Sequence, residues 1–276
     1  MIADYLFSRL ADLERKGTPF ALCTVVRATG SVPRHAGSKM LVFPDGSIEG
    51  SIGGGEMEGR VIAAARQTLS DGEAKVLSFS LSDPSQGDPG VCGGEVEVFV
   101  EPIGSRPTLV VFGGGHVGKA VVHLARWLGF RTVVADDRAE FASAEAIPDA
   151  DEHLVCTLSD LPQRVSIDGQ TYLVLTTRGV PIDVEGLPAL LDTAAAYIGV
   201  IGSRRRWETA GAELEAKGVP REKLDRVTSP MGLELNAETP EEIAVSILSE
   251  IIRLRRGGTG DPMRHSPRPK RQARAG

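Results

Sequence analysis

The stretch LVVFGGGHVG, residues 109–118, decides the fold of the second half of the chain. It runs from an apolar strand into a G-x-G-x-x-G pattern made by Gly113, Gly115 and Gly118, and a helix with one apolar face follows. A second apolar strand ends in Asp136, about 20 residues further on, as in a dinucleotide-binding βαβ unit. We therefore expect the glycines to bind a phosphate at the helix N-terminus and Asp136 to accept a ribose hydroxyl. The alternative is a nucleotide-type fold that has lost its ligand.

Strands and helices alternate through residues 108–256, and the strands are near-continuous apolar runs. Strands of this kind lie in a parallel sheet that helices cover on both faces. Residues 1–101 differ, with a helix followed by short strands and a turn at 44–47 that predicts a hairpin. We therefore predict an α/β protein, with an N-terminal α+β domain followed by a Rossmann-like domain with a parallel sheet. Residues 102–107 predict a linker, and residues 257–276 predict a disordered basic tail.

The composition excludes several classes of protein. The chain has 276 residues, a formal net charge of −6 and 41% hydrophobic residues, the balance of a globular protein and not of a general nucleic-acid binder. No run approaches the roughly 20 apolar residues of a membrane span, and the N-terminus reads as an amphipathic helix and not a signal peptide. Cys23, Cys92 and Cys156 are widely spaced, which argues against a disulfide framework or a structural zinc site. We expect a cytoplasmic protein that binds neither nucleic acid nor membrane.

Three strand ends in the second half carry polar turns that should meet at one edge of the sheet. They read Asp-Asp-Arg at 136–138, Thr-Thr-Arg at 176–178 and Gly-Ser-Arg-Arg at 202–205. Ligands of open α/β sheets bind in the crevice at the carboxyl ends of the strands. The turn with Ser203 and Arg204 opens a helix, so it predicts a second anion site in which the guanidinium binds a phosphate. A single such arginine is usually a surface ion pair, and the convergence of three turns favours a ligand.

The first half contains two further glycine-rich loops. Gly53, Gly54 and Gly55 join a strand to a helix, which predicts another anion site provided that the two glutamates in the first turn of that helix point away. Cys92 precedes two glycines in a loop. Free cysteines are usually small buried residues, but glycine neighbours argue against burial, so a functional thiol and a buried one stay equally open. His116, inside the Rossmann glycine loop, is likewise either a ligand contact or a packing residue.

The sequence contains no Ser–His–Asp signature, no His/Cys set with metal spacing and no Walker lysine, so it indicates a binding protein more clearly than a catalyst. A competing hypothesis is an NAD(P)-dependent oxidoreductase, supported by the Rossmann pattern and Asp136. Its one candidate proton donor, His116, is poorly placed in the phosphate loop. A third hypothesis is a nucleotide-sensing regulatory module whose N-terminal half binds a partner.

Taken in order, the motifs resemble the XdhC/CoxI family, the accessory proteins of xanthine dehydrogenase and related molybdenum hydroxylases. The resemblance rests on the runs TGSVPRHAGSKMLV, GSIGGG, VCGGEVEVFVEP, VVFGGGHVG, AAYIGVIGSRR and SPMGLELNAETPEEIAVSILSEI. It implies a non-catalytic chaperone that binds the molybdenum cofactor (molybdopterin), protects it during sulfuration and delivers it to an apo-molybdenum hydroxylase of the xanthine dehydrogenase type. It also implies a homodimer that contacts a cysteine desulfurase.

The same resemblance implies which residues contact the cofactor: the Gly53–Gly55 turn, Cys92, the Gly113–Gly118 loop with His116, Ser203 and Arg204. It also implies that Cys92 guards or ligates the molybdenum. This sequence departs from the family in two places. Glu56 stands where many relatives have a cysteine, and residues 176–178 read Thr-Thr-Arg where many relatives have a His-Asp pair. Either departure implies a different target enzyme or a different dinucleotide form of the cofactor.

Overall fold

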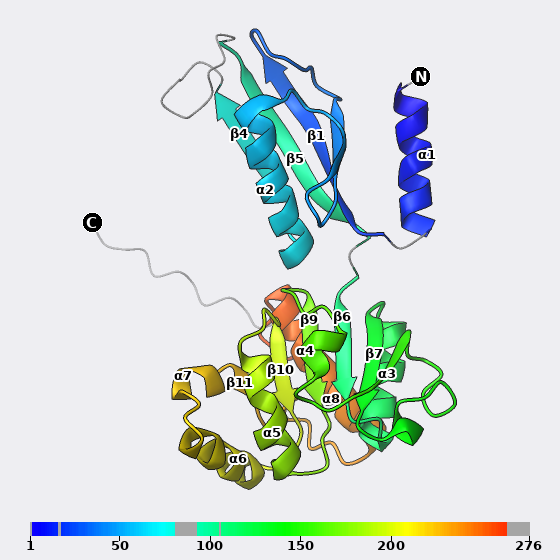
Figure 1. Cartoon of the computed structure of the whole chain (residues 1–276), viewed down its shortest axis with the longest axis vertical. Coiled ribbons are helices and arrows are strands. Elements are labelled where there is room, and N and C mark those ends of the chain that lie inside the picture. The colour runs from blue at the N-terminus through cyan, green and yellow to red at the C-terminus, as the bar shows by residue number, and fades with distance from the viewer. Residues whose placement is uncertain (1, 16–17, 81–92, 105, 264–276) are drawn as a thin grey trace, which may run out of the picture.

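The computed structural model of the chain describes residues 2–15, 18–80, 93–104 and 106–263. Two domains lie end to end along the long axis of the molecule, with the N-terminal domain at one end and the Rossmann-like domain at the other (Figure 1). Cys92 and most of the predicted basic tail lie outside the described residues. None of the described helices combines the length and the apolar character that crossing a bilayer would require.

The N-terminal domain is a five-stranded antiparallel sheet in the order β3-β2-β1-β5-β4, with a helix on each face. The apolar residues alternate along β5, so Val96, Val98 and Val100 are buried against Val61 and Ala65 of α2. A smaller apolar cluster joins α1 to the opposite face. The elements are α1 (Ile2–Arg15), β1 (Phe20–Thr29), β2 (Lys39–Val42), β3 (Ile48–Gly50), α2 (Gly55–Asp71), β4 (Lys75–Ser80) and β5 (Glu95–Ile103).

Two details of this domain bear on the sequence predictions. The predicted hairpin is confirmed, because β2 and β3 pair antiparallel on either side of the turn. Strand β5 is longer than expected and continues through Pro102 and Ile103, which pair with Ala21 and Phe20 of β1. Proline removes one ladder donor but is tolerated near a strand end. Two residues that the sequence assigned to the linker therefore belong to the sheet.

The second domain is a six-stranded parallel sheet in the order β11-β10-β9-β6-β7-β8. Counted from β6, this is the strand order of the Rossmann fold, with the switch point between β6 and β9. The predicted Rossmann-like domain is thus confirmed. Its elements are β6 (Thr108–Phe112), α3 (His116–Trp127), β7 (Arg131–Asp136), η2 (Ala139–Phe141), β8 (Glu152–Val155), α4 (Leu161–Arg164), β9 (Thr171–Leu175), α5 (Val180–Leu191), β10 (Tyr197–Val200), α6 (Arg204–Ala216), α7 (Arg221–Leu224), β11 (Val227–Thr228) and α8 (Pro240–Arg256).

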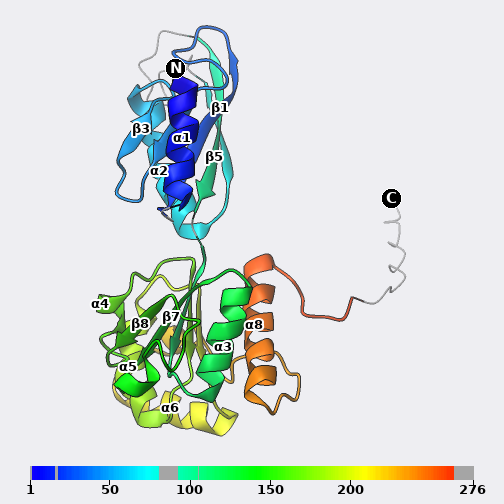
Figure 2. The same ribbon diagram turned by 90° about the vertical axis from the view of Figure 1, so that its right-hand side faces the viewer.

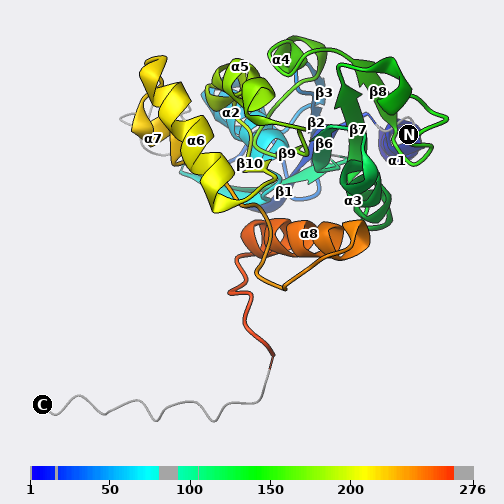
Figure 3. The same ribbon diagram turned by 90° about the horizontal axis from the view of Figure 1, so that it is seen from below.

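Helices cover both faces of the parallel sheet, with α3 and α8 side by side on one face and α4, α5 and α6 on the other (Figures 2 and 3). Side chains alternate along β6 between the two cores. Leu109 and Val111 pack with α3 and α8, whereas Val110 and Phe112 pack with the other group. This double coverage is the reason that the strands read as continuous apolar runs.

The two edges of the parallel sheet face different surroundings. The edge with the amino ends of the strands meets the N-terminal domain, where the Gln170 side-chain amide donates a hydrogen bond of 2.8 Å to the carbonyl oxygen of Leu69 in α2. The edge with the carboxyl ends points away from that domain (Figure 1). The predicted ligand crevice therefore lies at the end of the molecule remote from the N-terminal domain.

Candidate functional site

The glycine loop between β6 and α3 has the geometry of a phosphate site. A Cβ atom at Gly118 would lie 1.9 Å from the carbonyl oxygen of Gly113, so this position has room only for glycine. At Gly115, the residue that caps α3, a Cβ would meet no atom within 4 Å. No described residue accepts a hydrogen bond from the N–H groups of residues 115–118. Free donors beside open space at a helix N-terminus form an anion site.

His116 is exposed in the first turn of α3, beside the open space at Gly115. Its side chain makes no hydrogen bond with a described residue. The exposure of His116 does not support the alternative that it is a packing residue. Ligand contact stays a prediction.

Asp136 lies at the end of β7, as predicted, but its carboxylate already holds the glycine loop. The side chain is 2% exposed. Its oxygens accept hydrogen bonds of 3.0 Å from the N–H of Gly114, 3.0 Å from the N–H of Arg138 and 2.9 Å from Nε of Arg138. The predicted contact with a ribose hydroxyl stays a prediction, since these protein donors take up the carboxylate in this structure.

The three arginine turns of the carboxyl edge differ in what their guanidinium groups bind. Arg138 pairs with Asp136, and Arg178 pairs with Asp137 through two hydrogen bonds of 2.7 and 2.6 Å. These hydrogen bonds lower the pKa of Asp137 to about 2. Arg204 is exposed and makes no ion pair with any described residue. The guanidinium that the sequence predicted to bind phosphate is therefore free to do so.

The sequence did not reveal a buried network that supports the Ser203–Arg204 turn. Ser203 caps α6 and accepts a hydrogen bond from the N–H of Arg206. The Arg206 guanidinium donates to the fully buried carboxylate of Asp183 at 2.6 Å and to the hydroxyl of Thr177 at 2.6 Å. The signal in the sequence was a lone aspartate within the apolar helix VPIDVEGLPALL, because a buried charge requires a partner.

The glycine turn of the N-terminal domain is occupied by the protein itself. Glu58 of α2 points back into the turn, and its Oε2 accepts hydrogen bonds of 2.8 Å from Ser51 Oγ and 3.2 Å from each of the N–H groups of Ile52 and Gly54. The sequence predicted an anion site here only if the glutamates pointed away. One of them does not, so its carboxylate takes the place of the external anion.

The structure separates the predicted contact residues into two groups. The C-terminal end of α2 meets the amino edge of the parallel sheet, so the Gly53–Gly55 turn lies a whole helix, about 25 Å, beyond that contact. The carboxyl edge lies about 17 Å in the other direction, along β6. The turn and the Gly113–Gly118 loop are therefore about 40 Å apart. Gly93, the neighbour of Cys92, bridges to Ser31 within the N-terminal domain.

The described residues offer no metal site. They contain no cluster of three or more His, Cys, Asp or Glu side chains that could hold a metal ion. Burial raises the pKa of the Cys23 thiol to about 12 and also raises that of Cys156. Both are small buried side chains. The predicted molybdenum contact of Cys92 falls outside the described residues and stays a prediction.

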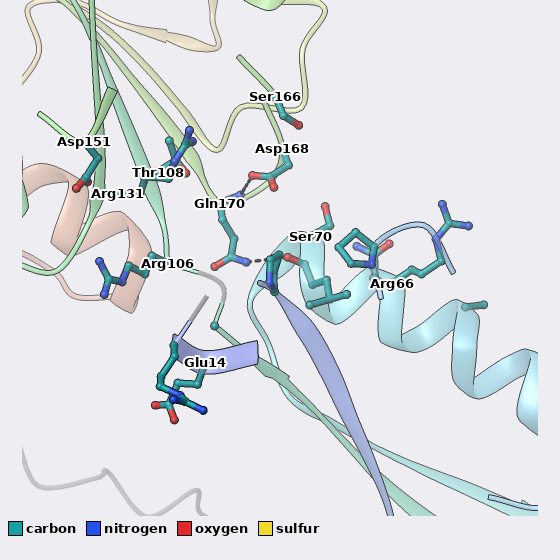
Figure 4. A pocket seen from close by; sticks show the side chains of 17 residues that line it. Glu14, Arg66, Ser70, Arg106, Thr108, Arg131, Asp151, Ser166, Asp168 and Gln170 are labelled. Atoms are coloured by element: carbon teal, nitrogen blue, oxygen red, sulfur yellow. Dashed lines mark hydrogen bonds between the residues drawn. The ribbon is translucent and has the colours of Figure 1, made fainter. Parts of the chain in front are cut away.

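A cavity of about 930 Å³ lies between the two domains, where no motif of the sequence points (Figure 4). Arg66, Arg106, Asp168 and Gln170 are among the side chains that line it. Asp168 accepts a hydrogen bond from the Gln170 N–H within its own loop. This cavity lies at the amino edge of the parallel sheet, whereas the switch point and the N–H groups at the start of α3 lie at the carboxyl edge.

Family models match both halves of the chain. The model described as the XdhC Rossmann domain matches residues 109–251, and that of the XdhC and CoxI family matches residues 13–80. A Bacillus halodurans protein whose crystal structure is described as that of a xanthine dehydrogenase has a TM-score of 0.50 and 23% identity, over 94% of this chain and 97% of its own. That likeness supports the fold.

Three curated relatives extend the comparison. The chain is 34% identical to the Escherichia coli uncharacterized protein YqeB, over 94% of this chain and 48% of the relative. It is 30% identical to a Bacillus subtilis protein named as a probable xanthine dehydrogenase subunit, over 58% of this chain and 46% of the relative. It is 23% identical to the molybdenum cofactor insertion chaperone PaoD of Escherichia coli, over 87% of this chain and 84% of the relative. The chain spans about half the length of the first two. It belongs to the XdhC and CoxI family.

Proposed function

We propose that this protein binds the molybdenum cofactor at the carboxyl edge of its Rossmann domain and serves the maturation of a molybdenum hydroxylase of the xanthine dehydrogenase type. The observation that carries the proposal is the open space at Gly115 beside unpaired N–H groups of α3. The family relationship supplies the identity of the ligand, because one relative is named as an insertion chaperone for this cofactor.

The residues at the carboxyl edge fit a ligand with a terminal phosphate. The N-terminus of α3 offers N–H donors and the positive end of the helix dipole. The exposed residue Arg204 lies in the turn after β10, two strands along the sheet from β6, and Ser203 caps the helix that begins there by accepting the N–H of Arg206. A phosphate is therefore held by donors of the main chain, with an arginine available from a second element.

The remaining steps of the proposed role are protection, sulfuration and delivery. A chaperone that shields its cargo requires binding without reaction. We propose that a cysteine desulfurase and the apo-enzyme are the partners and that the protein acts as a homodimer in the cytoplasm. The N-terminal domain, remote from the crevice, is available for such contacts (Figure 1).

An NAD(P)-dependent oxidoreductase is less well supported. Such an enzyme needs an acceptor for the ribose hydroxyls at the end of the second strand. In this chain that acceptor would be Asp136, whose carboxylate is buried and takes its hydrogen bonds from Gly114 and Arg138.

The test is isothermal titration of the purified full chain with molybdenum cofactor released from a donor enzyme, beside NAD and NADP. We expect micromolar binding of the cofactor and no response to NAD. Arg204→Ala should weaken cofactor binding by at least about tenfold, because a charge-assisted hydrogen bond contributes about 1.5–3 kcal/mol. The matched control is Arg221→Ala, which removes an exposed arginine paired with Glu215 and Asp225 at the far end of α6. Binding of NAD alone would overturn the proposal.

A further inference from the structure

We propose that the ion pair between Asp137 and Arg178 closes one half of the crevice, so that the site selects the cofactor with a free terminal phosphate over forms extended by a nucleotide. This inference rests on the proposed function, because it states which chemical form of the molybdenum cofactor the crevice binds. The sequence alone left this choice open.

The pair spans the middle of the carboxyl edge. Asp137 follows β7, and Arg178 lies three residues after the end of β9. Strand β6 separates these two strands, so their ends lie about 10 Å apart at the usual strand spacing. The guanidinium bridges this gap with hydrogen bonds of 2.7 and 2.6 Å to the two carboxylate oxygens. The ion pair therefore crosses the carboxyl end of β6, where the glycine loop begins.

A second pair fills the space beside the first. Arg178 also lies 3.9 Å from Asp136, which binds Arg138 and the N–H of Gly114. The Arg138 guanidinium stacks on the ring of Phe141 at 3.8 Å. A Cβ atom at Gly114 would lie 1.9 Å from the Phe141 carbonyl oxygen. The side of the loop that faces β7 is thus packed with protein atoms.

The loop is open where it enters α3. Gly115 borders free space, and Arg204 and Arg205 are exposed without an ion pair to any described residue. In Rossmann domains that bind dinucleotides, the pyrophosphate lies at the helix N-terminus and the nucleoside continues over the end of the second strand. In this chain the second strand is β7, so the nucleoside would have to displace both ion pairs. A ligand that ends in a single phosphate has no such requirement.

The experiment compares two forms of one ligand. The full-length chain is titrated with molybdenum cofactor that ends in a free phosphate and, separately, with cofactor joined through a pyrophosphate to cytidine. We expect the wild type to bind the first form more tightly by about threefold to fivefold, the ratio that an exposed ion pair supports. Arg178→Ala should bring the two affinities within about twofold by improving the binding of the dinucleotide form. Asp137→Asn breaks the same pair from the other side and should act in the same direction.

The outcomes separate this inference from the proposed function. If the wild type binds neither form, the proposed function fails and the inference fails with it. If the wild type binds both forms equally, or if Arg178→Ala weakens the free-phosphate form as much as the other, only the inference is overturned. Arg221→Ala, which removes exposed ion pairs far from the crevice, is the matched control and should leave the ratio unchanged. Thermal melting of each variant confirms that it is folded.

Discussion

The glycine turn before α2 and the glycine loop before α3 both lead from a strand into a helix, yet they hold different acceptors. In the N-terminal turn, Glu58 folds back and accepts the N–H groups of Ile52 and Gly54. In the Rossmann loop, the Asp136 carboxylate accepts a hydrogen bond from the N–H of one loop residue, Gly114. Gly115 borders open space. A glycine-rich turn at a helix start is therefore an anion site only where the chain does not supply the anion.

The largest effect is expected where the Rossmann loop tolerates no side chain. Gly118→Val would place a Cβ within 1.9 Å of the Gly113 carbonyl oxygen, so the unfolding free energy should fall by about 3 kcal/mol. Both tryptophans, Trp127 and Trp207, lie in the Rossmann domain, so their fluorescence in urea reports its unfolding. The control is Gly211→Ala in α6, where a Cβ meets no atom within 4 Å. Equal midpoints for Gly118→Val and wild type would contradict the close packing of the loop.

A smaller effect on stability is expected from removing the Glu58 carboxylate from the N-terminal glycine turn. Glu58→Ala removes the acceptor of three hydrogen bonds and should cost about 1–2 kcal/mol of unfolding free energy. It should also create an anion site, so inorganic phosphate should raise the melting temperature of the variant more than that of the wild type. Calorimetry measures both changes. Glu56→Ala, in the same turn but exposed, should do neither. If phosphate does not raise the melting temperature of Glu58→Ala, the turn does not bind an anion even without the Glu58 carboxylate.

The third effect concerns affinity alone. Gly115 has a φ of −70°, which valine can adopt, so Gly115→Val should leave most of the stability intact. Its side chain would fill the open space at the α3 N-terminus and weaken cofactor binding by about tenfold or more, equivalent to about 1.4 kcal/mol. Titration and melting are measured on the same sample. Wild-type affinity in a folded variant would mean that the loop serves the fold and not a ligand.

The sequence predicted the fold more completely than the site, and the two turns show why. The periodicity of apolar residues and the spacing of Gly113, Gly115 and Gly118 depend on local backbone geometry, so the strand–helix order followed from them. The occupancy of a turn depends on where a side chain several residues away points. The pairs Asp183–Arg206 and Asp137–Arg178 join residues 23 and 41 positions apart, and no spacing in the sequence encodes such contacts.

The smallest effect concerns how the stability of the Rossmann crevice depends on pH. Hydrogen bonds from Arg178 lower the pKa of Asp137 from 3.8 to about 2. Because the folded state holds this carboxylate ionised more strongly than the unfolded state does, the pair stabilises the protein above about pH 4 and loses its contribution as the pH falls toward 2. The side chains are 32% and 49% exposed, so solvent screening limits the contribution to less than about 1 kcal/mol.

The difference in urea midpoint between wild type and Asp137→Asn should therefore be small at neutral pH and vanish near pH 2. Asp225→Asn, which removes an exposed partner of Arg221, is the control for the loss of a surface carboxylate. A difference that persists at pH 2 would mean that Asp137 stabilises the crevice through contacts other than its charge.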